Sequence, residues 1–420
     1  MRDTIDTMPP NTFGLSPAQM KLIQEREHSS FVEMCNDRDL DPVDHARELY
    51  LFMRLLLGNH GVHLCEAGDE QMADVFLEML ERNDNFWDLL RALREMERPL
   101  TVRLISNASG IVPIHYRYLG SLAPELGIPP PRPDDLPSLE RFVESIPLLH
   151  LFGTTFNAFV KRESFVGDIP CVCVFELLLS AIDHFVDIVI PVVLSEDESH
   201  DMAVVDSGVC EERGRDPEVM DALRICLDEL FSAKGVETSG HNASCLSKGR
   251  FRRSYISMYT SGQSFIRMHE YGHLLMGHLS GKPCPRVEFE ADKWAWRVVL
   301  ASAPSVKHWP VYAMGIMSVL VMMVVLEKHQ GEEPEDTHPH ASKRLWAFLR
   351  DMAECDPAFT SILMHYANGM VAACNPTLAQ HYSLHIDTPD LVPDMNNDVF
   401  VAIKLCNAAQ AEVRNDGQSQ

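Results

Sequence analysis

Residues 269–273 have the sequence His-Glu-Tyr-Gly-His, and residues 288–292, fifteen positions beyond the second histidine, have Glu-Phe-Glu-Ala-Asp. Side chains four positions apart lie on one face of a helix, so His269 and His273 can direct two imidazoles at one metal ion. A carboxylate beside the first histidine can reach a water bound to that ion. We therefore expect a helix that carries half of a metal site and a candidate general base, Glu270.

The second segment is expected to complete this site. It follows a break at Gly281, Pro283 and Pro285 and opens another apolar helix. Glu288 can supply the third ligand, and Asp292, four positions on, can accept the other ring N–H of a ligating histidine. Glu290 is a rival ligand, but on a helical wheel it faces away if Asp292 faces the metal. We favour Glu288.

Histidines in a single sequence often only decorate a helix, and this simpler interpretation also fits the first segment alone. The two halves of the pattern together favour a metal site over this interpretation. His278, five residues beyond His273, is expected to project away from the metal and to be solvated if the helix continues that far. Trp294 and Trp296 are interpreted as core residues.

Composition excludes several classes of function. Hydrophobic residues make up 46% of the chain and charged residues 23%, as in folded globular proteins. The net charge of -25 opposes binding to nucleic acid or to an anionic membrane surface, which require clustered Lys and Arg. We expect no nucleic-acid partner.

Cysteine usage indicates a reducing compartment. The 11 cysteines are scattered without a Cys-x-x-Cys pair, unlike a disulfide framework. Cys171 and Cys173 lie in an apolar, strand-like run and are interpreted as small buried residues rather than a metal pair. The N-terminus lacks the pattern of a signal peptide, so we expect a cytoplasmic protein.

One apolar run, Val311 to Leu326, has the hydrophobic composition of a membrane-spanning helix. It falls a few residues short of the ~20 that a spanning helix needs, and no strongly basic flank orients it. A buried core helix is favoured over a membrane span.

The chain divides into three predicted regions. Residues 1–128 form a helical N-terminal region with a hairpin around Asn107-Ala108-Ser109-Gly110, between Leu100 and Leu119. A proline-rich linker at residues 129–133 leads to a catalytic domain over residues 137–350. Within it, residues 195–249 are expected to be an acidic insertion over the core. Residues 351–420 form a helical C-terminal region with a frayed tail.

These motifs resemble those of the gluzincin metallopeptidases, within them the HtpX-like and CaaX-prenyl-protease-like branch. Asn157-Ala158-Phe159 is similar to that branch's NAF segment, and Glu288 to Asp292 to its third-ligand helix. Asp336-Thr337-His338-Pro339, with Arg344 six residues after the histidine, is similar to its THP…R motif. The resemblance covers Asn157 to Arg344. The chain departs from the branch in its acidic insertion and in a short interval between His273 and Glu288.

The resemblance raises two further hypotheses, each with a structural alternative. His338 is expected to stabilise the tetrahedral oxyanion, with Arg344 orienting it or binding substrate carbonyls; alternatively, Thr-His-Pro only starts a helix. The segment from Asn157 to Val160 is expected to be an edge strand that pairs with an extended peptide; alternatively, it only packs in the sheet.

Together, the sequence predicts an α+β, helix-dominated protein with a gluzincin-like catalytic domain, a small sheet and added helical regions. The expected cofactor is Zn²⁺, held by His269, His273 and Glu288. Asp292 is expected to accept a hydrogen bond from one of the ligating histidines. The expected reaction is hydrolysis of peptide bonds in a protein or peptide substrate, with Glu270 activating the water. The alternative is a non-catalytic regulatory or interaction protein whose zinc site is structural or vestigial, with the acidic insertion as its binding surface. A structural site would be closed by a fourth protein ligand. The sequence indicates no oligomeric state.

Overall fold

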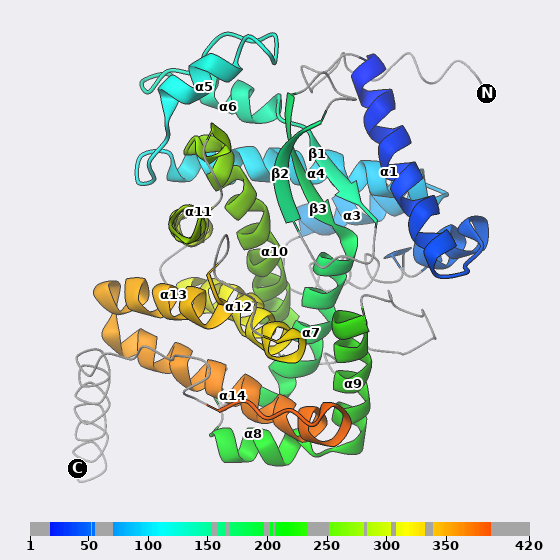
Figure 1. The fold of residues 1–420 in the computed structure, drawn as a ribbon, viewed down its shortest axis with the longest axis vertical. Coiled ribbons are helices and arrows are strands. Elements are labelled where there is room, and N and C mark those ends of the chain that lie inside the picture. Colours follow the sequence, from blue (N-terminus) through cyan, green and yellow to red (C-terminus); the bar gives the residue numbers. More distant parts are fainter. Residues whose placement is uncertain are drawn as a thin grey trace.

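Helices dominate the structure, which is a computed structural model (Figure 1). It describes residues 17–51, 53–54, 70–152, 158–163, 169–196, 202–204, 206–232, 252–280, 284–303, 308–331 and 339–387. The helices are α1 (Pro17–Asp37), α3 (Glu70–Arg82), α4 (Phe86–Ala108), α5 (Tyr116–Leu122), α6 (Leu136–Glu144), α7 (Glu176–Val193), α8 (Ser207–Gly214), α9 (Pro217–Ser232), α10 (Arg252–Leu275), α11 (Pro285–Ala301), α12 (Trp309–Gln330), α13 (Ala341–Cys355) and α14 (Pro357–Tyr382). Residues 42–51 are also helical. The expected α+β, helix-dominated class is confirmed.

The main sheet has three strands in the order β1-β3-β2. β1 (Leu148–Leu151) runs parallel to β3 (Ile169–Phe175), and β2 (Ala158–Glu163) runs antiparallel to β3. Cys171 and Cys173 are fully buried in the central strand, as predicted. A separate pair, β4 (Leu194–Glu196) and β5 (Met202–Val204), follows α7. β2 is thus the outermost strand on the side of the sheet that contacts α10.

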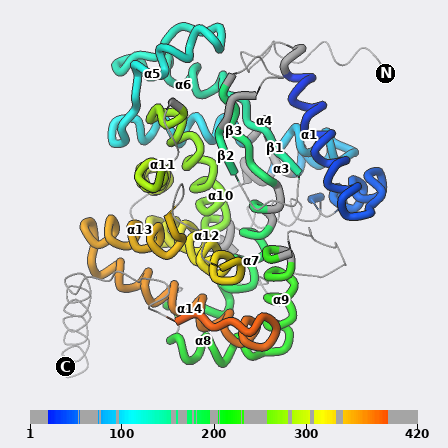
Figure 2. Tube along the Cα trace, viewed as in Figure 1, coloured from blue at the N-terminus to red at the C-terminus, as the bar shows by residue number. Residues whose placement is uncertain are grey.

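The opposite edge of the sheet is covered by α1 (Figures 1 and 2). The backbone N–H of His150 donates to Glu27 Oε1 (3.1 Å), and that of Phe152 donates to Ser30 Oγ (3.2 Å). Helix side chains therefore take the place of a neighbouring strand, which satisfies backbone donors at β1 that would otherwise lie buried and unbonded.

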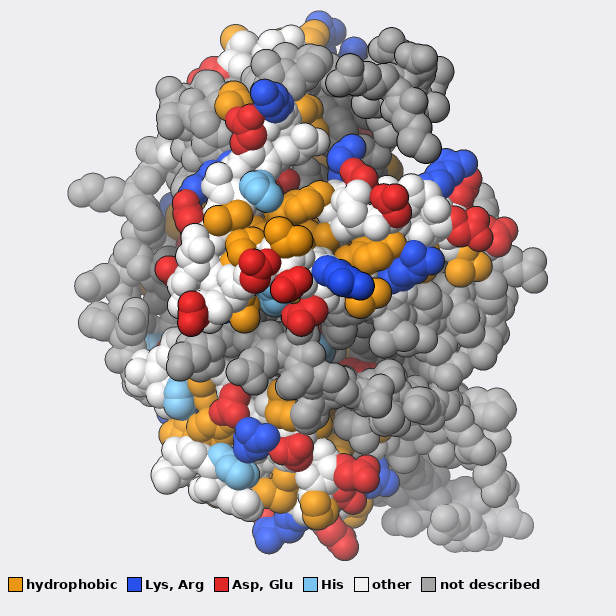
Figure 3. All heavy atoms as spheres, turned by 90° about the vertical axis from the view of Figure 1, so that its right-hand side faces the viewer, with side chains coloured by type: hydrophobic (Ala, Val, Ile, Leu, Met, Phe, Trp, Pro, Cys, Tyr) orange, Lys and Arg blue, Asp and Glu red, His pale blue; other side chains and the backbone are white. Residues whose placement is uncertain are grey.

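The outer face of this region carries charges of both signs. In the face drawn in Figure 3, acidic and basic side chains are interspersed with hydrophobic ones over the described residues. The net charge of -25 is therefore not concentrated into one acidic field on the described part of that face.

The hairpin predicted between Leu100 and Leu119 is wrong. α4 continues through Pro99 to Ala108, and α5 begins at Tyr116. Val102 and Ile105 are β-branched but lie on the buried face of α4, so tertiary packing overrides their weak preference for strands. The Asn-Ala-Ser-Gly signal marks the end of this helix, where Ser109 is the C-cap residue.

One hydrophobic core extends through most of the described chain, with α12 at its centre. It includes residues on both sides of the proline-rich segment 129–133, such as Leu119 and Phe142. Among the described helices, α12 alone is long and apolar enough to cross a membrane, and most of it is buried inside the protein. Trp294 and Trp296 are also core residues, as predicted.

Where it is described, the segment 195–249 packs directly on the core through α9. Leu223, Leu227 and Leu230 of α9 are buried in the core, because apolar residues recur at helical spacing in this otherwise polar stretch. α8 approaches α14 so closely that a Cβ on Gly214 would collide with the carbonyl of Ala373. The described part of the acidic segment is therefore built into the fold.

Close contact between α10 and α12 depends on Gly315. A Cβ at this position would collide with Ser261 Oγ and with the carbonyl oxygen of Met258 on α10. We expect Gly315→Ala to lower the free energy of unfolding by about 1–3 kcal/mol, although alanine favours helices, because a backbone carbonyl cannot move aside. Urea unfolding measures this change. Gly110→Ala is the control, since its Cβ would meet nothing within 4 Å; equal stability of the two variants would contradict the expectation.

Candidate metal centre

Two helices bring the predicted ligands together. α10 supplies His269 and His273, and α11 supplies Glu288 from its first turn. The helices approach closely at Gly272, where a Cβ would lie 3.3 Å from the carbonyl oxygen of Ala291. This close approach places the ligand-bearing faces of both helices against one another.

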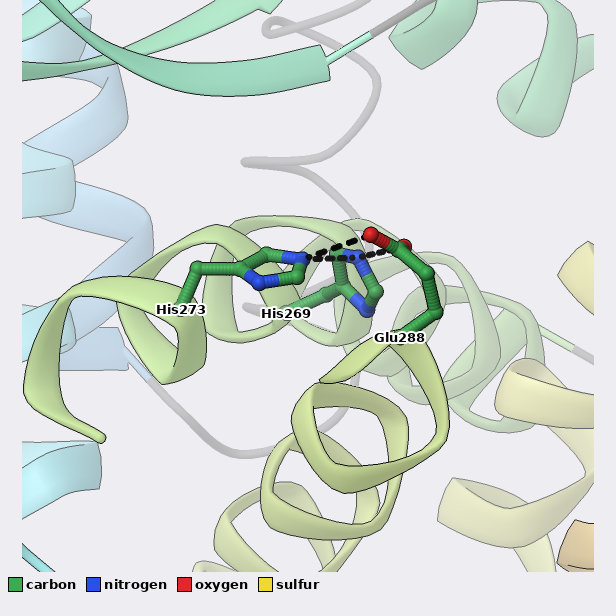
Figure 4. Close-up of side chains that lie close together, drawn as sticks. All are labelled: His269, His273 and Glu288. Atoms are coloured by element: carbon green, nitrogen blue, oxygen red, sulfur yellow. Dashed lines mark hydrogen bonds and ion pairs between the residues drawn. The ribbon is translucent and has the colours of Figure 1, made fainter. Parts of the chain in front are cut away.

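Three ligand atoms converge at this crossing (Figure 4). The Nε2 atoms of His269 and His273 are 3.0 Å apart. The Glu288 carboxylate lies 3.3 Å from His269 Nε2 and 3.5 Å from His273 Nε2. Among the described residues, these three form the group of His, Cys, Asp and Glu side chains that could hold a metal ion. Two imidazoles and one carboxylate match a zinc site that leaves a fourth position open.

Asp292 and Arg344 hold the first histidine in place. His269 Nδ1 donates to Asp292 Oδ1 at 2.8 Å, so its Nε2 faces the ligand cluster. Arg344 binds the same carboxylate through two hydrogen bonds of 2.6 and 2.7 Å. The predicted partnership of Asp292 with a histidine ring is thus present in the geometry, and Arg344 from α13 extends it.

Burial and charge set the ionisation of this cluster. Burial alone would lower the pKa of His269, but its bond to Asp292 and the nearby carboxylates raise that pKa to about 10. Burial acts to raise the pKa of Asp292, yet Arg344 and His269 bring it down to about 2. Asp292 therefore remains ionised at neutral pH.

Glu270 lies beside the ligand cluster and is 5% exposed. Its Oε1 is 4.0 Å from His269 Nε2. Burial raises the pKa of this carboxyl group, partly opposed by His269, His273 and Arg344. A carboxylate with a raised pKa is a better proton acceptor than a solvated one, which suits a general base.

His278 differs from the prediction. Its side chain is 9% exposed, and its Nδ1 lies 3.1 Å from His273 Nδ1. α10 ends at Leu275, so the chain does not follow the helical path on which the prediction depended. Glu290, the rival ligand, faces His278 rather than the cluster, with 3.3 Å between Glu290 Oε2 and His278 Nε2. The sequence signal for this turn was Gly277.

A cavity of about 400 Å³ opens over the cluster. Its polar part is formed by His269, Glu270, His273, His278, Glu288 and Arg344. Its apolar wall consists of Ala158, Phe159 and Val160 of β2, Leu178, Phe265, Ile266, Leu279, Val287, Val319 and Met323. The candidate metal centre therefore borders a chamber that can hold part of a ligand beside the outermost strand.

The predictions for His338, as oxyanion donor, and for Arg344, as its orienting or substrate-binding partner, have different outcomes. His338 lies outside the described residues, as do Asn157, Asp336 and Thr337. Arg344 lines the cavity, but its hydrogen bonds go to Asp292. Its contact with a substrate stays a prediction.

Comparison with known proteins relates part of the chain to a peptidase family. Residues 233–362 match the model of the family described as Peptidase U49. No curated protein and no solved structure matches the chain. The matching segment is less than a third of the chain, but it includes α10, α11 and every site residue from His269 to Arg344. Over the segment that carries the candidate metal centre, the chain is similar to Peptidase U49, and this similarity supports a peptidase function.

Proposed function

We propose that this protein is a zinc-dependent endopeptidase of gluzincin type. The observation that carries the proposal is the convergence of His269, His273 and Glu288 on one point at the edge of a cavity, with Glu270 beside it. The similarity of the surrounding segment to a peptidase family supports the same conclusion. A His2Glu set is a donor set that zinc accepts in catalytic sites.

The residues suggest a division of tasks. When bound, zinc would polarise the scissile carbonyl and lower the pKa of a water molecule. Glu270 takes a proton from that water and transfers it to the leaving amine, for which its buried carboxyl group with a raised pKa is suited. Asp292 fixes the tautomer of His269, and Arg344 holds Asp292.

The cavity supports an extended polypeptide as substrate. β2 is the outermost strand of the main sheet, and three of its residues line the cavity wall. A peptide laid along β2 would pass over the ligand cluster and place a backbone carbonyl near Glu270, as in recognition by strand addition.

A regulatory protein with a structural zinc site is the alternative, and the geometry disfavours it. Structural zinc sites are closed by four protein ligands, whereas the described residues offer three in one group. Among the described residues, the further imidazole of His278 contacts the Nδ1 side of His273 rather than its Nε2 side. A structural site also has no use for a carboxylate in the position of Glu270.

Metal analysis combined with chelation tests the proposal. We expect about one zinc per chain, cleavage of a denatured-protein mixture, loss of cleavage after chelation and its return with Zn²⁺. Zinc binding without cleavage of any substrate in the mixture would favour the regulatory alternative. A folded protein that binds no zinc would refute the proposed function.

A further inference from the structure

The two histidines of the candidate centre have different partners on their second ring nitrogen. His269 Nδ1 donates directly to a carboxylate, that of Asp292. His273 Nδ1 instead meets another imidazole, His278 Nδ1, at 3.1 Å. A histidine that binds a metal through Nε2 carries its proton on Nδ1, so this second atom needs an acceptor.

A tight turn delivers His278 to this position. Gly277 has φ = +81°, a conformation that L side chains rarely adopt, and it ends α10 within two residues of Leu275. A Cβ there would also lie 2.8 Å from His115 Nδ1. The chain then forms the short 3-10 helix His278–Ser280, and the rings of His273 and His278 cross at 70° with centroids 5.2 Å apart.

Glu290 completes a chain of three groups. Its Oε2 lies 3.3 Å from His278 Nε2, and its Oε1 lies 3.4 Å from Arg286 Nε. One set of proton positions satisfies every contact: His273 Nδ1–H donates to His278 Nδ1, and His278 Nε2–H donates to Glu290. Two residues of the same α11 segment therefore serve the two sides of His273. Glu288 faces the ligand cluster, and Glu290, two positions later, faces the imidazole of His278.

We propose that His278 and Glu290 are positioning residues that hold His273 in the orientation and tautomer required for metal binding. The inference rests on the proposed function, since it concerns the same site. His278 supplies the acceptor that Asp292 supplies to His269. Glu290, through its carboxylate, keeps the proton of His278 on Nε2 and leaves Nδ1 free to accept.

Zinc affinity tests this role without measuring catalysis. The metal-free protein is titrated with Zn²⁺ against a chromophoric chelator, and Co²⁺ is used for d–d absorption spectra. We expect His278→Phe, which keeps a ring but removes the acceptor, to raise the zinc Kd by about 10- to 100-fold. Its Co²⁺ spectrum should also change, because His273 loses its fixed orientation.

Variants of Glu290 separate its role from that of His278. Glu290→Leu is expected to raise the Kd, whereas Glu290→Gln retains an acceptor oxygen and should bind zinc more tightly than the leucine variant. Because Glu290 acts through His278, the double variant His278→Phe/Glu290→Leu should match His278→Phe within about twofold. Additive losses of affinity would overturn the role given to Glu290.

His45→Phe is the matched control. His45 is a buried histidine, 6% exposed, that also has a carboxylate neighbour, Glu48, but it lies in the N-terminal region. Its zinc affinity and Co²⁺ spectrum should equal those of the wild type even if its stability falls. If His278→Phe does not fold, the zinc affinities of the Glu290 variants test the positioning role instead. The Glu290 side chain is 40% exposed, so its replacement should leave the fold intact.

Different results would overturn the proposed function and the positioning role of His278. Wild-type protein that binds no zinc would overturn both the proposed function and this inference. Wild-type protein that binds zinc and cleaves peptides, alongside a His278→Phe variant with unchanged Kd and unchanged Co²⁺ spectrum, would overturn the positioning role alone.

Discussion

Glu270→Gln is expected to lower kcat for peptide hydrolysis by about 10²- to 10⁴-fold while the protein still binds zinc. The amide has nearly the shape of the carboxylate but cannot accept the proton of the attacking water. The three ligand side chains, His269, His273 and Glu288, are unaltered. Steady-state cleavage of a fluorogenic peptide, together with metal analysis of the same samples, measures both quantities.

Glu27→Gln is the control for this prediction. Glu27 is also a buried glutamate, 2% exposed, but it accepts a backbone hydrogen bond at the sheet edge, which an amide oxygen can also do. Its kcat should equal that of the wild type. Full activity of Glu270→Gln would remove Glu270 from the mechanism, and loss of zinc from this variant would mean that Glu270 helps to hold the metal.

Asp292→Ala is expected to destabilise the metal-free protein by about 3–5 kcal/mol. Asp292 is completely buried, and its carboxylate binds Arg344 through two hydrogen bonds and His269 through a third. Removing it leaves a buried guanidinium without its counter-charge, which is among the costliest changes in a protein interior. Urea unfolding followed by circular dichroism measures the loss.

The double variant Asp292→Ala/Arg344→Met separates the ion pair from packing. Removing both charges avoids the unpaired guanidinium, so the double variant should be more stable than Asp292→Ala. Zinc affinity should nevertheless stay reduced, because His269 still lacks its acceptor. A loss below about 1 kcal/mol for Asp292→Ala would show that the pair contributes little to stability.

The ligand cluster could be predicted because, within each helix, the residues that form it are only four positions apart in the sequence. The spacing of His269 and His273 fixes one helical face, and Glu288 and Asp292 share a face of the next helix for the same reason. The buried strand at residues 169–175 was also evident from its continuous run of apolar residues. What remained was the relative placement of the two helices, which no periodicity specifies.

The errors have two physical causes: the hairpin error depended on contacts distant in sequence, and the His278 error depended on a local turn. Val102 and Ile105 favour strands locally, but burial against the core keeps them helical. His278 was placed by extending a helix that ends at Leu275, and only the left-handed Gly277 indicated a different path.

The buried position of α12 has a consequence for biosynthesis. This helix has the length and composition of a segment that the membrane-insertion machinery accepts, yet in the folded chain it packs on α10, α13 and α14. Two of those partners are translated after it. The ~50 residues from its end to the end of α14 take roughly 3 to 10 s to synthesise at about 5–20 residues per second. During that interval α12 is a candidate client for chaperones that shield apolar nascent segments.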